Sequence, residues 1–289
     1  MLVSTHTHSL IDLKDLHTIL RVIKKAGFDA YDYSMFNMGE ELNNAVNFAF
    51  MDDYKEKALE LRKYADSIGL VCNQAHAIFP SFFLGNEELT KEKVSQTIKC
   101  MEIASILGAK IIVVHPENNA TPEENLIFYK TLEPYCKKFN IKIGVENMWN
   151  WKKGEPTCCE AACSYPDNYL KHMQLLDSPW FVACVDIGHA EMMPNTSAPE
   201  IIEKLGNYVG ALHIHDNDKI HDNHQIPYSN KIDFNAVIEA LRDIHYQGDI
   251  TLEVENFARF FPKDEEHYQI AANILFEVAN KIRQGVLQK

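Results

Sequence analysis

Short apolar runs alternate with amphipathic stretches along almost the whole chain, and this alternation constrains the fold more than any other feature. Eight runs have the length and continuous hydrophobicity of buried β-strands. They begin close to Leu2, Phe28, Leu70, Ile111, Ile141, Phe181, Val209 and Ile250. Strict alternation of this kind predicts a parallel sheet, and eight units predict a closed (β/α)8 barrel. The sequence therefore predicts an α/β fold in which residues 1–289 form a single TIM-barrel domain.

Local signals mark the expected helices. Three helical stretches each stop at a glycine, the residue type favoured just past a helix end: Gly27, Gly69 and Gly108. Thr121 and Pro122 are residue types typical of an N-cap and a first helical position. An open doubly wound sheet is the main competing fold, but the sequence contains neither a GxGxxG motif nor a P-loop to support it.

At least six of the strand-like runs end in a histidine or a carboxylate. These ends are His76, His115, Glu146, Asp186, His213 or His215, and Glu253. The carboxyl ends of barrel strands meet at one face, where unpaired carboxylates would repel one another. Acids and imidazoles on strands five to eight therefore indicate a shared cation. Two or three carboxylates with an imidazole suit Mn²⁺, Co²⁺, Mg²⁺ or Zn²⁺.

Other polar candidates lie close to these strand ends. His189 follows Asp186 by three residues, so both side chains can face one cavity. His213 and His215 point the same way along an extended strand. The remaining candidates lie at the first strand or in loops beyond the later strands: His6, His8, Trp149, Lys219, Asp222 and His224.

Charge and composition narrow the class of partner. The net charge is −13, and an acidic surface repels a phosphate backbone, so no nucleic-acid partner is expected. The sequence has no apolar run of about 18 residues and no secretory signal at its start, which predicts a cytoplasmic protein without a membrane partner. Seven cysteines without framework spacing suit reduced thiols. Aromatic residues in the loops are compatible with a homodimer.

Taken together, the strand-end motifs resemble those of the xylose isomerase-like barrel superfamily. This group contains sugar phosphate isomerases and epimerases, and it is related to ketose 3-epimerases and endonuclease IV. The resemblance covers nearly the whole chain, and its densest part is Val113 to Asn256. The matching stretches are Val-Val-His115-Pro, Val-Glu146-Asn, Val-Asp186-Ile-Gly-His189, Leu-His213-Ile-His-Asp216-Asn-Asp, His221-Asp222-Asn-His224 and Gly248-Asp-Ile-Thr-Leu-Glu253-Val.

The resemblance implies a metal set and an acid/base pair. The implied metal ligands are Glu146, Asp186, His213 and Glu253, and Glu146 and Glu253 also inherit the acid/base role. The family pattern favours His213 over His215 because an acid, Asp216, follows three residues later. It favours Glu253 over Glu255 by the spacing from Gly248. Counterparts of a multinuclear zinc set are His76, His115, His189, Asp222 and His224, so the resemblance implies one to three ions.

The implied activity is that of a divalent-metal-dependent isomerase or epimerase. Its substrate would be a small carbohydrate, a sugar or sugar phosphate, and the reaction would be proton transfer through a metal-stabilised enediolate. The expected substrate contacts are His8, Trp149, His189, His215 and Lys219. Three alternatives remain: a dehydratase or lyase acting on a keto-sugar or polyol, an endonuclease IV-like zinc phosphodiesterase, and a sugar-binding barrel without activity.

Overall fold

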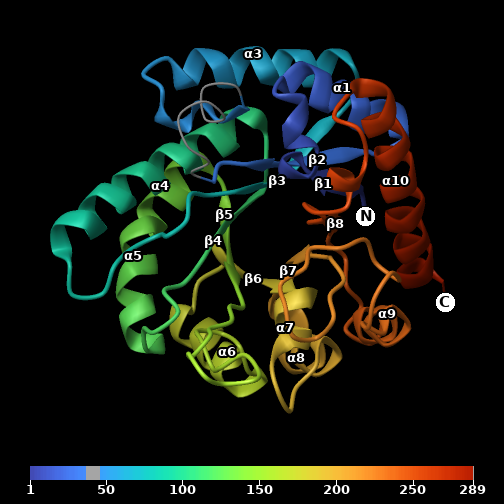
Figure 1. The fold of residues 1–289 in the computed structure, drawn as a ribbon. Coiled ribbons are helices and arrows are strands. Elements are labelled where there is room, and N and C mark those ends of the chain that lie inside the picture. Colours follow the sequence, from blue (N-terminus) through green and yellow to red (C-terminus); the bar gives the residue numbers. More distant parts are fainter. Residues whose placement is uncertain (37–45, 289) are drawn as a thin grey trace.

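The structure is a computed structural model that describes residues 1–36 and 46–288. Eight parallel strands surround a common axis in the order β7-β6-β5-β4-β3-β2-β1-β8 (Figure 1). Their bounds are β1 Val3–His6, β2 Ala30–Ser34, β3 Val71–His76, β4 Ile111–Val114, β5 Lys142–Glu146, β6 Phe181–Asp186, β7 Val209–His213 and β8 Ile250–Leu252.

A short seam between β7 and β8 closes the barrel. Ile214 and Leu252 form an isolated parallel bridge there. The Ile214 amide donates to the Thr251 carbonyl at 3.0 Å, and the Glu253 amide donates to the Ile214 carbonyl at 3.1 Å. The prediction of a (β/α)8 barrel is therefore confirmed.

Helices form the outer layer of the molecule (Figure 1). Within the described residues, the α-helices are α1 Leu16–Ala26, α3 Tyr54–Ser67, α4 Glu87–Leu107, α5 Pro122–Phe139, α6 Pro166–Leu176, α7 Ile187–Met192, α8 Ala198–Leu205, α9 Phe234–Asp243 and α10 Glu265–Leu287. The same residues contain the 3₁₀ helices η1 Thr7–Leu13, η2 Phe48–Phe50, η3 Gly206–Tyr208 and η4 Ala258–Phe260. No helix in the described part of the chain is long and apolar enough to cross a membrane.

The helix ends follow the signals in the sequence. Thr121 and Glu124 form a reciprocal capping box at the start of α5. Gly108 ends α4 in the left-handed conformation, with φ of 95°. At the start of α1, the Asp15 side chain accepts the Thr18 amide, so the helix begins at Leu16. The short helix α7 follows β6 directly, capped by the Asp186 side chain.

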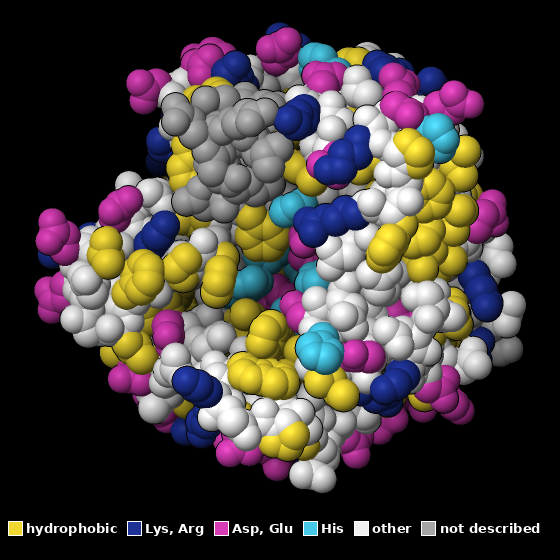
Figure 2. Space-filling model, viewed as in Figure 1, with side chains coloured by type: hydrophobic (Ala, Val, Ile, Leu, Met, Phe, Trp, Pro, Cys, Tyr) yellow, Lys and Arg dark blue, Asp and Glu magenta, His cyan; other side chains and the backbone are white. Residues whose placement is uncertain are grey.

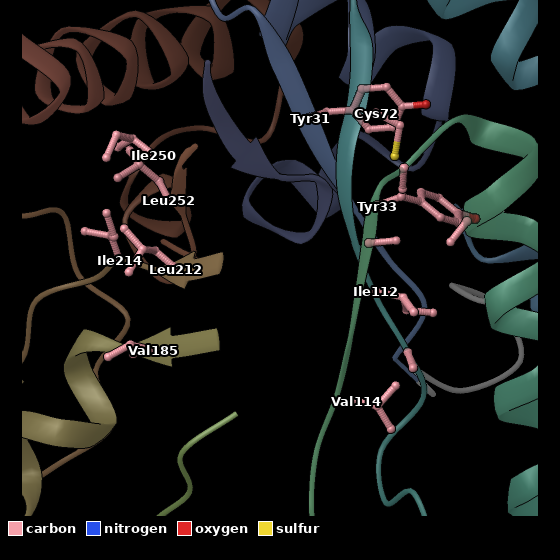
Figure 3. Packing of buried hydrophobic residues seen from close by; sticks show 14 of the residues in the cluster. Tyr31, Tyr33, Cys72, Ile112, Val114, Val185, Leu212, Ile214, Ile250 and Leu252 are labelled. Carbon is pink, nitrogen blue, oxygen red and sulfur yellow. The ribbon is translucent and has the colours of Figure 1, made fainter. Parts of the chain in front are cut away.

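Strand alternation separates an apolar outer surface of the barrel from a polar interior. Figure 3 shows outward residues of several strands packed in the main core, among them Tyr31, Tyr33, Ile112, Val114, Leu212, Ile214, Ile250 and Leu252. Residues between these positions point to the opposite face of each strand. There, Val113, Cys184 and Ala211 form a separate small apolar cluster. Continuing the same alternation to the carboxyl ends brings the predicted acids and histidines into the mouth of the barrel.

Candidate metal centre

Four groups from the ends of β5 to β8 converge on one point. Glu146, Asp186, His213 and Glu253 each place a ligand atom within 4.8 Å of the others, and all four are buried. His213 Nδ1 lies 3.1 Å from Glu146 Oε1 and 3.1 Å from Glu253 Oε2. One ring nitrogen therefore faces two carboxylates at once. The structure brings together the four residues that the family resemblance implied as metal ligands.

The electrostatics of this group favour a cation. Burial raises the pKa of the Glu146 carboxyl, but the facing imidazoles of His213 and His115 outweigh it and hold that pKa well below its usual range. Burial likewise raises the pKa of Glu253, and His213 outweighs burial and lowers it. Both carboxyl groups are thus ionised at neutral pH and buried beside the carboxyl group of Asp186. Such a concentration of negative charge is stabilised only by protonated imidazoles or by a bound cation.

The donor atoms also fit a divalent metal ion. Asp186 Oδ2 has no hydrogen-bond partner in the part of the chain that the structure describes, although the residue is fully buried. Three carboxylates and one imidazole match the oxygen and nitrogen donors preferred by Mn²⁺, Co²⁺, Mg²⁺ and Zn²⁺. Asn147 holds the backbone of Asp186 in place at the end of β6. Its Oδ1 accepts the Asp186 amide at 2.8 Å, and its Nδ2 donates to the Asp186 carbonyl at 2.9 Å.

His76 and His115 adjoin Glu146 on the β3–β4 side. His115 Nε2 lies 2.9 Å from Glu146 Oε2, and His76 Nε2 lies 2.9 Å from His115 Nε2. His76 Nδ1 contacts the Ala77 carbonyl at 2.8 Å. A carbonyl only accepts, so Nδ1 carries a proton, and the Nε2 side of the ring is turned toward His115 and Glu146.

A second buried group lies on the β6–β7 side. His189, His215, Asp222 and His224 have ligand atoms within 4.8 Å of one another. Two of these rings are oriented like His76. His189 Nδ1 donates to the Asn147 carbonyl at 2.9 Å, and His224 Nδ1 donates to the Glu253 carbonyl at 3.0 Å. Both Nε2 atoms are then turned toward Asp222, at 3.5 Å and 3.0 Å. Backbone carbonyls commonly orient metal-binding histidines in this way.

His215 connects the two groups. Its Nε2 lies 3.1 Å from Asp186 Oδ1, and its ring stacks on that of His224 with centroids 4.1 Å apart. Gly188 in α7 makes room for this ring, since a Cβ atom at that position would lie 1.9 Å from His215 Cε1. A glycine in α7 is therefore required for His215 to occupy its place.

Gly188→Ala should weaken metal binding at the group formed by His189, His215, Asp222 and His224. The added methyl displaces the fully buried His215 ring, and a displaced supporting residue commonly lowers metal affinity about 10- to 100-fold. Equilibrium dialysis with Zn²⁺ measures the change, with circular dichroism as a check on folding. Gly85→Ala is the control: no atom lies within 4 Å of its Cβ position, so its cost is confined to backbone strain at its φ of 73°, and zinc affinity should stay unchanged. Unchanged affinity in folded Gly188→Ala would contradict this role for the glycine.

A cavity of ≈ 370 Å³ opens onto these groups. Figure 2 shows the hollow at the centre of this face, with histidine and acidic side chains in its depth and hydrophobic side chains around it. The polar part of the lining includes Glu146, His189, Asp222, Glu253 and Glu255. Aromatic side chains contribute the apolar part of the wall, namely Phe36, Phe79, Trp149 and Trp151.

Of the five expected substrate contacts, two line this cavity and three do not. Trp149 and His189 line it, with ring centroids 6.4 Å apart. His215 is fully buried beside Asp186, and His8 lies beside Glu255. The ammonium group of Lys219 pairs with Glu191 Oε2 at 2.8 Å, and neither residue is part of the cavity lining.

Sequence reasoning gave no role to two buried residues of this centre. Asp32 on β2 lies 3.5 Å from His213 Nε2 and accepts a hydrogen bond from Gln74 at 2.8 Å. Asn147 holds Asp186 and His189, as described above. The strand alternation through Tyr31 and Tyr33 could have revealed Asp32, which is the polar residue between two outward aromatics. Asn147 has a weaker signal, its position directly after Glu146.

Solved structures with the same fold include sugar epimerases. The chain aligns with a D-tagatose 3-epimerase-like protein at 23% identity and a TM-score of 0.73, over 97% of this chain and 99% of that one. It aligns with D-psicose 3-epimerase from Clostridium cellulolyticum H10 at 14% identity and a TM-score of 0.72, over 98% and 99%. An IOLI protein crystallised with a zinc atom aligns at 17% identity and a TM-score of 0.72, over 99% and 98%.

Two curated relatives are uncharacterized proteins. Protein y4fM of Sinorhizobium fredii is 24% identical over 216 residues, which cover 69% of this chain and 65% of the relative. Protein MJ1311 of Methanocaldococcus jannaschii is 30% identical over 183 residues, covering 59% of each. The chain thus matches about six tenths of the length of these two relatives. The family model described as Xylose isomerase-like TIM barrel matches residues 20–277, and the chain belongs to that family.

Proposed function

We propose that the protein is a divalent-metal-dependent isomerase or epimerase of a small sugar or sugar derivative. The observation that carries the proposal is the contact of two buried carboxylates, Glu146 and Glu253, with one nitrogen of His213 at the edge of the cavity. Asp186 completes the donor set. A divalent ion held by these four residues would supply Lewis-acid stabilisation for negative charge that develops on a substrate carbonyl.

The two glutamates act as the acid/base pair. One carboxylate removes the proton on the carbon next to the substrate carbonyl, and the electron pair moves into the carbonyl to give an enediolate. In an isomerase, the glutamate that accepted the proton returns it to the adjacent carbon, while a proton passes between the two oxygen atoms of the enediolate. In an epimerase, the other glutamate takes a proton from water and gives it to the opposite face of the same carbon, and the first glutamate then releases its proton to water. The depressed pKa values of Glu146 and Glu253 keep both carboxyl groups ionised and ready to accept a proton in the free protein.

The cavity wall supports a sugar as the substrate. Aromatic rings pack on the apolar C–H faces of sugars, and Trp149, Trp151, Phe36 and Phe79 line the cavity. His189 presents its Nε2 side to the same space and is placed to hold a hydroxyl group. Structural neighbours that bear the names of ketose 3-epimerases support the same class of reaction, although their likeness extends to the fold alone.

Hydrogen exchange tests the proposal directly. The metal-loaded protein is incubated in D₂O with D-tagatose, D-fructose and D-psicose, and the sugars are followed by NMR. We expect deuterium at the carbon next to the carbonyl in at least one ketose, together with the epimer or isomer. Loss of water to give a deoxy-dicarbonyl would instead identify a dehydratase. If neither these ketoses nor their phosphates, incubated in the same way, exchange a proton although the protein holds its ions, the proposal is wrong.

A zinc phosphodiesterase is the second candidate, and a specific observation favours it. The His76–His115 pair beside Glu146 and the group around Asp222 supply more metal donors than a single ion needs. The net charge of −13 opposes a nucleic-acid substrate. Cleavage of an abasic-site DNA duplex by the zinc-loaded protein, without exchange in any ketose, would select this activity.

A further inference from the structure

A third group of metal-binding side chains joins the two ends of the barrel sheet. His6 ends β1, His8 lies in the first turn of η1, and Glu255 follows β8. The strands β1 and β8 pair in parallel, with Thr5 opposite Leu252, so their carboxyl ends lie side by side. His6 Nδ1 lies 3.4 Å and His8 Nδ1 lies 3.3 Å from the same atom, Glu255 Oε1.

These ligand atoms are buried without hydrogen bonds. The His6 side chain is fully buried, and neither of its ring nitrogens has a hydrogen-bond partner among residues 1–36 and 46–288. Within the same residues, His8 Nδ1 and Glu255 Oε1 are also buried and unpartnered. Burying a polar atom without a partner destabilises the folded state, because the atom loses its hydrogen bonds to water. Three of these atoms, His6 Nδ1, His8 Nδ1 and Glu255 Oε1, surround one point and therefore indicate a ligand that would satisfy them together.

The spacing of the three atoms suits a tetrahedral ion. Bonds of about 2.0–2.1 Å to a tetrahedral zinc place neighbouring ligand atoms about 3.3–3.4 Å apart. The observed separations of 3.4 Å and 3.3 Å from Glu255 Oε1 match this geometry. Two imidazoles and one carboxylate are also a donor set that zinc uses when it keeps a fourth position open.

We propose that His6, His8 and Glu255 form a separate binding site for one late first-row divalent cation, Zn²⁺ or Co²⁺. The site shares no ligand with the group formed by Glu146, Asp186, His213 and Glu253. Because Glu255 lines the cavity next to Glu253, the open position faces the space assigned to the substrate. An anionic or hydroxyl oxygen of the substrate is the ligand class suited to that position, a step that rests on the proposed function.

Cobalt stoichiometry tests the site without using activity. Wild-type, Glu255→Gln and His8→Ala proteins are stripped of metal, dialysed against Co²⁺ and analysed for bound cobalt. Each variant should bind one ion fewer per chain than the wild type and keep its circular dichroism spectrum. Glu265→Gln is the matched control, because that carboxylate pairs with Arg21 on the outer helices, and it should bind the wild-type number. Wild-type stoichiometry in both Glu255→Gln and His8→Ala would overturn the proposal.

A gain of signal provides an independent readout. His8→Cys replaces one imidazole by a thiolate and so keeps the number of donors at three. The cobalt-loaded variant should therefore show a near-ultraviolet sulfur-to-cobalt charge-transfer band above the wild-type baseline. Absence of this band in folded His8→Cys would contradict the site.

The cobalt measurements also separate this site from the proposed function. Loss of one ion in Glu255→Gln supports the site even if no ketose reacts, and unchanged stoichiometry rejects it even if ketoses do react.

Discussion

Glu146→Gln should lower kcat for the reacting ketose by about 10²- to 10⁴-fold at saturating metal. The substitution keeps the size of the side chain but removes the group that accepts a proton, and positioned acid/base groups commonly contribute a factor in this range. It also removes one charge from the buried set that faces His213 at 3.1 Å. Steady-state kinetics measure kcat, and deuterium exchange into the ketose reports the proton-transfer step alone. The exchange rate should fall together with kcat.

A carboxylate on the outside of the barrel provides the matched control. Glu265→Gln changes the same functional group at the start of α10, where it pairs with Arg21, and should leave kcat within about twofold of the wild-type value. Circular dichroism and bound metal are measured for both variants, because Glu146 is also a proposed ligand. A folded, metal-loaded Glu146→Gln protein with wild-type kcat would remove Glu146 from the mechanism.

Chelation should lower the melting temperature of the protein by roughly 5–10 °C at neutral pH. A ligand present at about 100 times its dissociation constant stabilises the folded state by about 2.7 kcal/mol, and this free energy is lost with the ion. Without the ion, the carboxylates of the three groups depend on imidazolium protons for charge balance. Differential scanning calorimetry with and without EDTA measures the loss.

The loss on chelation should grow as the pH rises. Burial lowers the pKa of His189, but Asp186 and Asp222 outweigh burial and raise that pKa to about 10. A raised pKa contributes stability that is complete below the unfolded value of about 6.5 and disappears as the pH passes the folded value. The metal-free protein therefore loses stability between pH 7 and pH 10. His189→Gln should show a smaller pH-dependent loss, and equal slopes for both proteins would contradict this account.

The sequence was sufficient to predict the barrel and the positions of most candidate ligands. Continuous apolar strands, glycine helix ends and the Thr121 cap carry their information locally, so the strand and helix order follows from them. Strand alternation then decides which side chain enters the barrel. The strand ends therefore group Glu146, Asp186, Glu253 and a histidine of the seventh strand, the family resemblance favours His213 over His215, and the structure places Glu146, Asp186, His213 and Glu253 together.

Partners across distant loops could not be predicted in the same way. The choice between Glu253 and Glu255 depended on a family spacing, whereas the structure places these residues in two different groups. The pairing of Lys219 with Glu191 depends on how two loops pack beyond β6 and β7, and periodicity carries no information about that packing. Asp32 was overlooked because a single acid between two tyrosines has an ordinary explanation as a buried hydrogen-bond acceptor.

The order in which the strands occur along the chain has a consequence for biosynthesis. The centre at the barrel mouth takes one residue each from β5, β6 and β7, and its last donor, Glu253, follows the final strand. A growing polypeptide on the ribosome therefore cannot present the complete donor set until the last strand of the barrel has been translated. Stable ion capture at the proposed site would then follow synthesis of the whole barrel, and it would select molecules that contain all eight strands over those whose synthesis stopped before β8.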